Sequence, residues 1–395
     1  MVLLIVVALL PLALLLYAYL VYPALLWLVT RFSRSTRTTS ATAEWPRVTI
    51  TVPVYNAAGA IATTLERLLD LDYPKERLQI LVISDASNDG TDDVVAGFES
   101  RGVELLRMPA RLGKTAAENA AVAVARGEII VNVDATILIP RTSLKPLVRA
   151  FADPSVGVAS GRDVSMGETA VEGTQAESGY VGYEMWLRTL ETEVGSIVGA
   201  SGCFYGFRRS IHERPLPEEL SWDFASALVA AEQGYRAVSV VDAICVVPRT
   251  VALRTELSRK TRTMARGLST LFHKRRLMNP LRYGAFAFML VSHKLARWLP
   301  YLTLPLALLA LGVLATRSNV ALILFVLAIV GIVAGIVGIR WPRTKPVPRL
   351  FALAGFVLAA FVAGFLAWMD ALRKKRTPTW EPTPRATTPL GTPTR

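Results

Sequence analysis

The sequence predicts an α/β domain with a mostly parallel sheet, joined at both of its ends to α-helical membrane-spanning segments. Short β-branched runs alternate with helical patterns between residues 46 and 255, as in βαβ units. Apolar runs long enough to cross a bilayer lie at residues 1–30 and within 299–370. Of the 395 residues, 52% are hydrophobic and 19% are charged, which excludes a disordered or fibrous chain and disfavours a wholly soluble one.

The positive charge is explained better by a membrane than by nucleic acid. The chain has 44 Lys and Arg against 31 Asp and Glu, a formal charge of +13. Most of the basic clusters flank apolar runs, where the positive-inside rule expects them. The sequence of the α/β region shows neither zinc-ligand spacing nor basic residues interleaved with aromatics, so we predict no nucleic-acid partner.

The amino-terminal run, residues 1–30, has no charged side chain, no basic leading region and no small-residue cleavage site. We therefore expect a membrane anchor and not a signal peptide. Arg31, Arg34 and Arg37 in the basic linker, residues 31–45, place the following domain in the cytoplasm. The two cysteines, Cys203 and Cys245, are too few for a disulfide scaffold, which agrees with a reducing compartment.

The carboxy-terminal part predicts basic and interfacial helices at 256–298, transmembrane helices at 299–370 and a disordered, basic, Pro/Thr-rich tail at 371–395. Within Tyr283–Trp298, the polar residues His293, Lys294 and Arg297 interrupt an apolar stretch, as in a helix lying in the membrane interface. The spans expected after it are Leu299–Ala315, Val320–Ile339 and Leu350–Met369. Three crossings would put the basic residues 373–376 outside, against the charge rule. Either one segment is re-entrant, or the interfacial stretch crosses, or the rule does not hold here.

In the α/β domain, polar side chains follow the predicted strands directly. The predicted strands are Val48–Val52, Leu78–Ile83, Val103–Leu106 and Glu128–Val133, and the predicted helices are Ala60–Leu71, Thr91–Glu99, Ala116–Arg126 and Phe224–Gln233. Ligands of open parallel sheets bind beyond the carboxyl ends of the strands. Tyr55, Asn56, Asp85 and Asp134 fall at those ends, so we expect a binding site there.

Each charged candidate also has a purely structural interpretation. Asp134 and Asp223 could simply cap turns or helices, and the turn residues after Asp85 could do the same. Asp85 itself ends an apolar strand and could instead accept a hydrogen bond from a base or a ribose hydroxyl. Lys114 opens a helix whose dipole opposes its charge, so an anion such as a pyrophosphate would explain it better. Asp134 could bind a divalent cation, and Asp223 could act as a general base.

A basic stretch, Arg259–Gly267, precedes the carboxy-terminal membrane segments. It is either a polybasic segment that faces lipid or a clamp over phosphates.

Taken in order, these segments resemble the family 2 inverting glycosyltransferases, which have a GT-A fold. The motifs that carry the resemblance are Val52-Pro-Val-Tyr-Asn56, Val82-Ile-Ser-Asp-Ala-Ser-Asn-Asp-Gly-Thr91, Gly113-Lys-Thr-Ala-Ala-Glu-Asn119, Ala125-Arg-Gly-Glu-Ile-Ile130, Gly199-Ala-Ser-Gly-Cys203 before Arg208-Arg209, and Trp222-Asp223 with Gly234-Tyr-Arg236. The match covers roughly residues 46–280, and the membrane arrangement resembles that of the cellulose, chitin, hyaluronan and poly-N-acetylglucosamine synthases.

The resemblance implies a role for each matching residue. Asp223 would be the general base, and Arg262 would steady the departing diphosphate, with Arg266 beside it. Pro53, Tyr55, Asn56, Asp85 and Lys114 would bind the nucleotide; Asp134 and Thr136 would bind Mg²⁺ or Mn²⁺; and Gly202 and Cys203 would face the acceptor.

Two departures from the family's motifs limit what the resemblance implies. Thr136 stands where the family has a second metal-binding Asp, and a hydroxyl is a weaker ligand than a carboxylate, so metal dependence is open. The Gln-x-x-Arg-Trp motif of the synthases appears as Arg259-Lys-Thr-Arg262-Thr263, without the tryptophan. This weakens the case for processive synthesis and leaves a single transfer as an alternative.

The sequence therefore predicts a multi-pass enzyme of the cell membrane with a cytoplasmic catalytic domain. Its partners would be a nucleotide-sugar donor, UDP-linked by expectation, a polysaccharide or lipid-linked acceptor, and the lipid bilayer; the oligomeric state is not predicted. The alternative is a catalytically weak scaffold subunit of a synthase complex. A transporter is disfavoured because the carboxy-terminal segments show no internal repeat.

Overall fold

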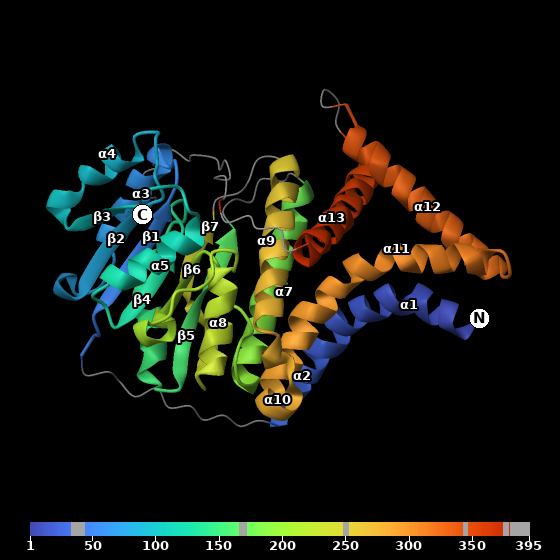
Figure 1. Cartoon of the computed structure of the whole chain (residues 1–395), viewed down its shortest axis with the longest axis horizontal. Helices are drawn as coiled ribbons and strands as arrows, with labels where there is room; N and C mark the ends of the chain where they lie inside the picture. Colours follow the sequence, from blue (N-terminus) through green and yellow to red (C-terminus); the bar gives the residue numbers. More distant parts are fainter. Residues whose placement is uncertain (33–43, 166–171, 248–252, 343–346, 374–378, 380–395) are drawn as a thin grey trace, which may run out of the picture. The chain divides into compact units, whose positions relative to one another are not determined.

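The computed structural model describes residues 1–32, 44–165, 172–247, 253–342, 347–373 and 379, but not the side chains of 165, 172–181 and 253–260. Most of the predicted linker and tail lies outside the described residues. The chain divides into a helical unit, residues 1–25, 252–271 and 288–375, and a sheet unit, residues 26–251, 272–287 and 376–395. Figure 1 labels the helices and strands of both units.

The sheet unit is built on one seven-stranded sheet in the order β3-β2-β1-β4-β6-β5-β7. The strands are β1 (Val48–Val54), β2 (Leu78–Ser84), β3 (Val103–Arg107), β4 (Ile129–Val133), β5 (Val156–Ser165), β6 (Phe204–Arg208) and β7 (Arg236–Val247). All neighbouring strands are parallel except β6, which runs antiparallel to both β4 and β5. The prediction of an α/β fold with a mostly parallel sheet is confirmed.

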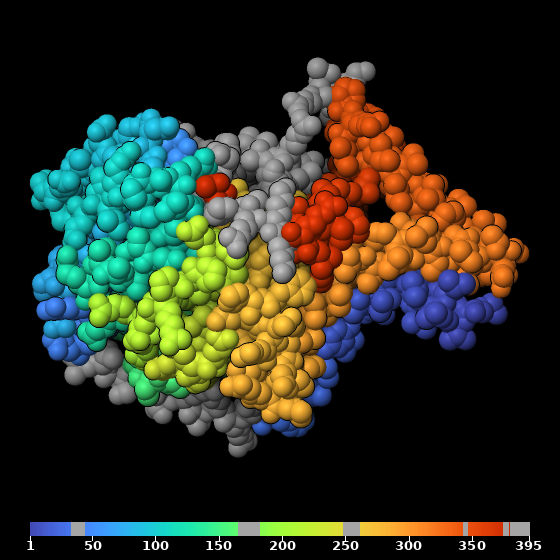
Figure 2. All heavy atoms as spheres, in the orientation of Figure 1, coloured from blue at the N-terminus to red at the C-terminus, as the bar shows by residue number. Residues whose placement is uncertain are grey.

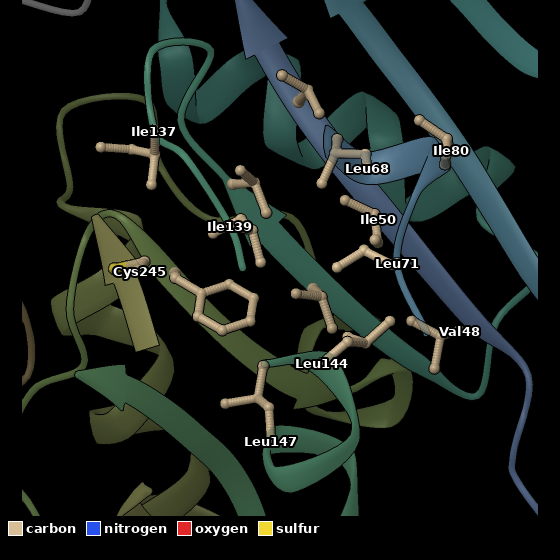
Figure 3. Packing of buried hydrophobic residues seen from close by; sticks show 14 of the residues in the cluster. Val48, Ile50, Leu68, Leu71, Ile80, Ile137, Ile139, Leu144, Leu147 and Cys245 are labelled. Atoms are coloured by element: carbon tan, nitrogen blue, oxygen red, sulfur yellow. The ribbon is translucent and has the colours of Figure 1, made fainter. Parts of the chain in front are cut away.

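One face of the sheet packs an apolar core against helices. The helices on this side are α3 (Ala58–Leu69), α4 (Thr91–Ala96) and α6 (Leu144–Arg149). Alternate residues of β1, among them Val48 and Ile50, meet Leu68 of α3 and Leu144 of α6 in this core (Figure 3). Period-two alternation places these side chains on the same face of the strand.

The opposite face is covered by α5 (Lys114–Val124) and α8 (Trp222–Glu232) (Figure 1). Thr115 and Asn119 of α5 donate side-chain hydrogen bonds to the carbonyls of Leu220 and Leu216 at 2.9 and 2.8 Å. The atoms of α5 and of the segment that leads into α8 therefore adjoin on the surface (Figure 2). These bonds fix the start of α8 relative to the start of α5, where two of the predicted site residues lie.

The sheet unit also contains α7 (Glu172–Val194), and α9 (Leu253–His273) begins in the helical unit. The other helices are α1 (Val2–Leu16), α2 (Tyr22–Phe32), α10 (Pro280–Leu290), α11 (Ala296–Ala315), α12 (Asn319–Arg340) and α13 (Arg349–Leu372). Two π-helical turns, Tyr17–Val21 and Val291–Leu295, join α1 to α2 and α10 to α11.

Four helical runs among the described residues are long and apolar enough to cross a membrane. They are Val2–Phe32, Pro280–Ala315, Asn319–Arg340 and Arg349–Leu372. The 36 residues of Pro280–Ala315 join the expected interfacial stretch and the first expected span into one run, with a break in helical geometry at Gly284. The side of the membrane on which each loop lies stays a prediction.

Candidate active site

The loops after β1 and β2 are tied together by hydrogen bonds. The backbone N–H of Asn56 donates to Ser87 Oγ at 3.2 Å, and the N–H of Asn88 donates to Asn56 Oδ1 at 3.0 Å. Asn56 and Ala86 both have positive φ values, 49° and 55°. A left-handed conformation is costly for alanine and is common at functional sites, so this strand edge is held in a strained geometry by its neighbours.

The turn after Asp85 matches the structural interpretation of that segment. Asp89 accepts hydrogen bonds from the backbone N–H groups of Thr91 at 3.0 Å and Ala58 at 3.1 Å. Burial alone would raise the pKa of Asp89, but its bonds to the Thr91 hydroxyl and to these N–H groups lower it below its usual value. Asp89 therefore fixes the start of α4 and ties it to the loop after β1.

Asp85 is fully buried at the end of β2. Its two carboxylate oxygens accept the backbone N–H groups of Leu112 and Gly113 at 2.8 and 2.9 Å. Asp85 thus orients the loop that opens α5. Its expected contact with a base or ribose stays a prediction.

Tyr55 follows β1 and carries the guanidinium of Arg111 over its ring, 3.8 Å from the ring centre. A cation this close to an aromatic face is attracted to it. The sequence reasoning missed Arg111, although its position three residues before Lys114 is a usable signal. Pro53 is buried in β1 opposite Ile83, and its expected part in nucleotide binding stays a prediction.

Lys114 and Asp134 form an ion pair at the centre of the candidate site. Lys114 Nζ lies 2.6 Å from Asp134 Oδ1, donates a long hydrogen bond of 3.4 Å to the carbonyl of Gly202, and is 3.8 Å from Glu118 Oε1. Burial alone would lower the pKa of Lys114, but the charges of Asp134 and Glu118 outweigh it and raise the pKa above its usual value. Gly113, with φ 97°, turns the chain into α5 so that Lys114 begins the helix.

Asp223 lies in the first turn of α8, where the helix dipole favours a carboxylate. Ser221 Oγ donates to its Oδ1 at 2.6 Å. A Cβ on Gly202 would stand 3.2 Å from Asp223 Oδ2, so glycine leaves room for the carboxylate beside this loop. Gly202 therefore contacts Lys114 and lies beside Asp223, so the structure brings the three predicted residues together.

The residues around Asp134 suit a divalent cation that is shared with a substrate diphosphate. No group of three or more His, Cys, Asp or Glu that could hold a metal occurs in the part of the chain that the structure describes. Asp134 is 29% exposed, and Thr136 follows it in the turn closed by the bond from Ile137 N to Asp134 O. Mg²⁺ is commonly held by one or two carboxylates plus substrate phosphates, and this donor set agrees with that arrangement.

The roles of Cys203, Arg262 and Arg266 stay predictions. Cys203 precedes β6, and its carbonyl accepts the N–H of Asp134 at 3.3 Å, so it lies beside the ion pair. Arg262 and Arg266 lie on α9 in the helical unit. Their contact with a departing diphosphate stays a prediction, and the side chain of Arg259 lies outside the described residues.

With this geometry established, residues 49–215 match the family model described as Glycosyl transferase family 2. This match supports a family 2 glycosyltransferase domain at these residues. The fold of the domain is that of the GT-A glycosyltransferases.

Solved and curated relatives agree with this domain assignment. The mannosyltransferase PcManGT from Pyrobaculum calidifontis, solved in complex with GDP-Man and Mn²⁺, has a TM-score of 0.71 and 25% identity, and covers 94% of this chain and 100% of its own. An N-acetylglucosaminyltransferase of Rhizobium meliloti (strain 1021) is 27% identical over 228 residues, 52% of each chain. A beta-monoglucosyldiacylglycerol synthase of Synechocystis is 26% identical over 167 residues, 40% of this chain and 35% of its own. The chain thus spans about half the length of these curated relatives, or less.

Proposed function

We propose that the chain is a membrane-bound inverting glycosyltransferase that moves a sugar from a nucleotide-diphosphate sugar to an acceptor hydroxyl. The observation that carries this proposal is the grouping of Lys114, Asp134 and Asp223 around Gly202 at one edge of the sheet. It provides an ammonium for a diphosphate, a carboxylate for a cation and a second carboxylate for a proton.

In the proposed reaction, Asp223 takes the proton of the acceptor hydroxyl. The acceptor oxygen attacks the anomeric carbon from the face opposite the nucleotide, and the bond from that carbon to the diphosphate oxygen breaks with inversion. The leaving diphosphate keeps the electron pair. Negative charge develops on this diphosphate, and Lys114 stabilises it. We propose that Arg262 and Arg266 stabilise it too. A divalent cation held by Asp134 and Thr136 would neutralise further charge on the diphosphate.

The donor proposed from sequence is UDP-linked. GDP-mannose is the second candidate, because the relative with the TM-score of 0.71 was solved with GDP-Man and Mn²⁺. The acceptor is proposed to be a growing polysaccharide or a lipid-linked glycan, met at the cytoplasmic face of the membrane. The four helical runs of the described residues that are long enough to span a bilayer support a membrane-bound acceptor, by processive synthesis or by single transfer.

The test is nucleotide release from a panel of UDP- and GDP-sugars by the detergent-purified chain, with and without membrane lipid extract as acceptor. Asp223→Asn should lower kcat by about 10²- to 10⁴-fold, the usual contribution of a general base, while donor binding persists. Asp72→Asn is the matched control, because Asp72 is exposed and its ion pair is with Lys145.

Near-normal turnover by Asp223→Asn with donor bound would overturn the proposed base. Donor binding without release, even with lipid extract, would favour the alternative of a scaffold subunit.

A further inference from the structure

Glu118 is a carboxylate buried beside the site, and no step of the proposed reaction uses it. Its side chain is 1% exposed, and it lies one helical turn after Lys114 on α5. A buried carboxylate is costly unless charged or hydrogen-bonding groups compensate it. The contacts of Glu118 therefore indicate what it does.

Those contacts hold the carboxylate in place. Asn132 Nδ2 donates to Glu118 Oε1 at 3.1 Å and to the hydroxyl of Tyr205 at 2.7 Å, and Thr51 Oγ1 donates to Asn132 Oδ1. Asn132 and Tyr205 are on neighbouring strands of the sheet, β4 and β6. Glu118 is thus fixed by the rigid part of the fold, whereas Lys114 reaches out to the strand end on a flexible stem.

Lys114 lies between two carboxylates, 2.6 Å from Asp134 and 3.8 Å from Glu118. A divalent cation on Asp134 would repel the ammonium, because like charges at such distances are strongly unfavourable away from bulk water. The ammonium must then move, and Glu118, whose Oε1 is 3.8 Å from Lys114 Nζ, is a carboxylate within its reach.

We propose that Glu118 is a positioning residue that retains the Lys114 ammonium when a divalent cation takes its place on Asp134. Lys114 then acts as the resident counter-ion of Asp134 in the absence of metal, and it turns towards Glu118 and the diphosphate when the cation and donor are bound. This inference rests on the proposed function, since it assumes a cation at Asp134. It predicts that Lys114 and Mn²⁺ compete for the Asp134 carboxylate. It also predicts that Glu118 raises the affinity for Mn²⁺ only by holding the Lys114 ammonium away from Asp134.

The experiment measures Mn²⁺ binding to the detergent-purified full chain by electron paramagnetic resonance, without donor. The proteins are wild type, Lys114→Met, Glu118→Gln and the double variant. Glu66→Gln is the control, because it removes a carboxylate from an exposed ion pair with Arg101. Thermal unfolding of each variant shows whether it is folded.

Lys114→Met should bind Mn²⁺ about tenfold more tightly, and Glu118→Gln about three- to tenfold more weakly, as expected for residues coupled in one ionic network. In the Lys114→Met background, Glu118→Gln should change the affinity less than twofold. With the donor present, Lys114→Met should raise KM in spite of tighter Mn²⁺ binding.

An equal effect of Glu118→Gln in both backgrounds would overturn the inference, because Glu118 would then act directly on the cation. Unchanged or weaker Mn²⁺ binding by Lys114→Met would also overturn it, even if Glu118→Gln did not fold. If the enzyme transfers sugar but the effect of Glu118→Gln does not depend on Lys114, the inference is refuted and the proposed function stands. If the effect does depend on Lys114 but neither transfer nor donor hydrolysis occurs, the proposed function is refuted and the inference stands.

Discussion

The two faces of the sheet differ in chemistry although they share the same strands. On β1, Val48, Ile50, Val52 and Val54 point into the apolar core under α3 and α6. The residues between them, including Thr49 and Thr51, are equally buried but lie on the opposite face, towards α5 and α8.

On that opposite face, Thr49 and Thr51 each belong to a cluster of buried polar groups. In one, Thr49 Oγ1 donates to Gln79 Oε1 at 2.8 Å and accepts the N–H of Gly127 at 2.8 Å. The other joins Thr51, Asn132, Tyr205 and Glu118. The second cluster offsets the cost of burying its polar groups by the hydrogen bonds between them. It leads to Lys114, which suggests that one face serves stability and the other positions the site.

Leu65→Ala tests the apolar face. Leu65 lies on α3 with 0% exposure, and removing its side chain should lower the free energy of unfolding by about 2–5 kcal/mol through lost burial and a cavity. Denaturant unfolding of the purified chain measures the loss. At temperatures where the variant is folded, its Mn²⁺ affinity and donor KM should match those of the wild type. A change in either would mean that the two faces are not separable.

Asn132→Leu tests the polar face with a side chain of similar size. Thr51, Tyr205 and Glu118 each lose a hydrogen bond from or to Asn132, which should cost about 1–3 kcal/mol of unfolding free energy. Because Glu118 is then no longer fixed, Mn²⁺ affinity should also fall, unlike in Leu65→Ala. A stability loss with unchanged Mn²⁺ binding would show that the network is structural only.

Much of the fold was predictable because β1, β2 and β4 are short buried runs, β3 is a short and partly buried one, and clear helical patterns lie between them. The predicted strand Leu78–Ile83 differs from β2 by one residue, and the predicted helix Ala116–Arg126 is α5 displaced by two. The first strand was predicted to end at Val52, but β1 continues through Pro53 to Val54. It pairs with β4 only as far as Thr51, and beyond that point a residue without an N–H is tolerated. Strands β5, β6 and β7 were not predicted, and the antiparallel direction of β6 depends on tertiary pairing that no local pattern encodes.

For the candidate site, the sequence predicted which residues lie at the strand ends, but it did not predict their ion-pair and hydrogen-bond partners. The grouping of Lys114, Asp134 and Asp223 was expected through the family resemblance, whereas the ion pair of Lys114 with Asp134 was not. Glu118 is part of the motif that begins at Gly113, but no role was predicted for it. Its burial and its contact with Asn132 depend on packing between α5 and β4. Arg111 was missed for the same reason, since its ring partner Tyr55 is distant in sequence.

His212 offers a smaller test of the face covered by α8. Its ring lies 4.5 Å from that of Trp222, and its Nε2 is 2.8 Å from Ser226 Oγ. Burial, with a contribution from Lys274, lowers the pKa of His212 to about 3. In the unfolded chain this histidine binds a proton below about pH 6.5, whereas in the folded chain it stays neutral down to about pH 3. The unfolded state therefore binds more protons in this window, and His212 should cost up to about 1.4 kcal/mol of stability per unit fall in pH.

His212→Gln should flatten the fall of unfolding free energy between pH 6 and 4, as assayed by denaturant titration at each pH, whatever its effect at pH 7. His273→Gln is the matched control, because His273 is exposed at the end of α9 and should leave the slope unchanged. Equal slopes for wild type and His212→Gln would mean that the ring gains a proton without unfolding. The packing of His212 against Trp222 would then be looser than the structure shows. Since Trp222 directly precedes Asp223, the proposed base would also be held less firmly by this face.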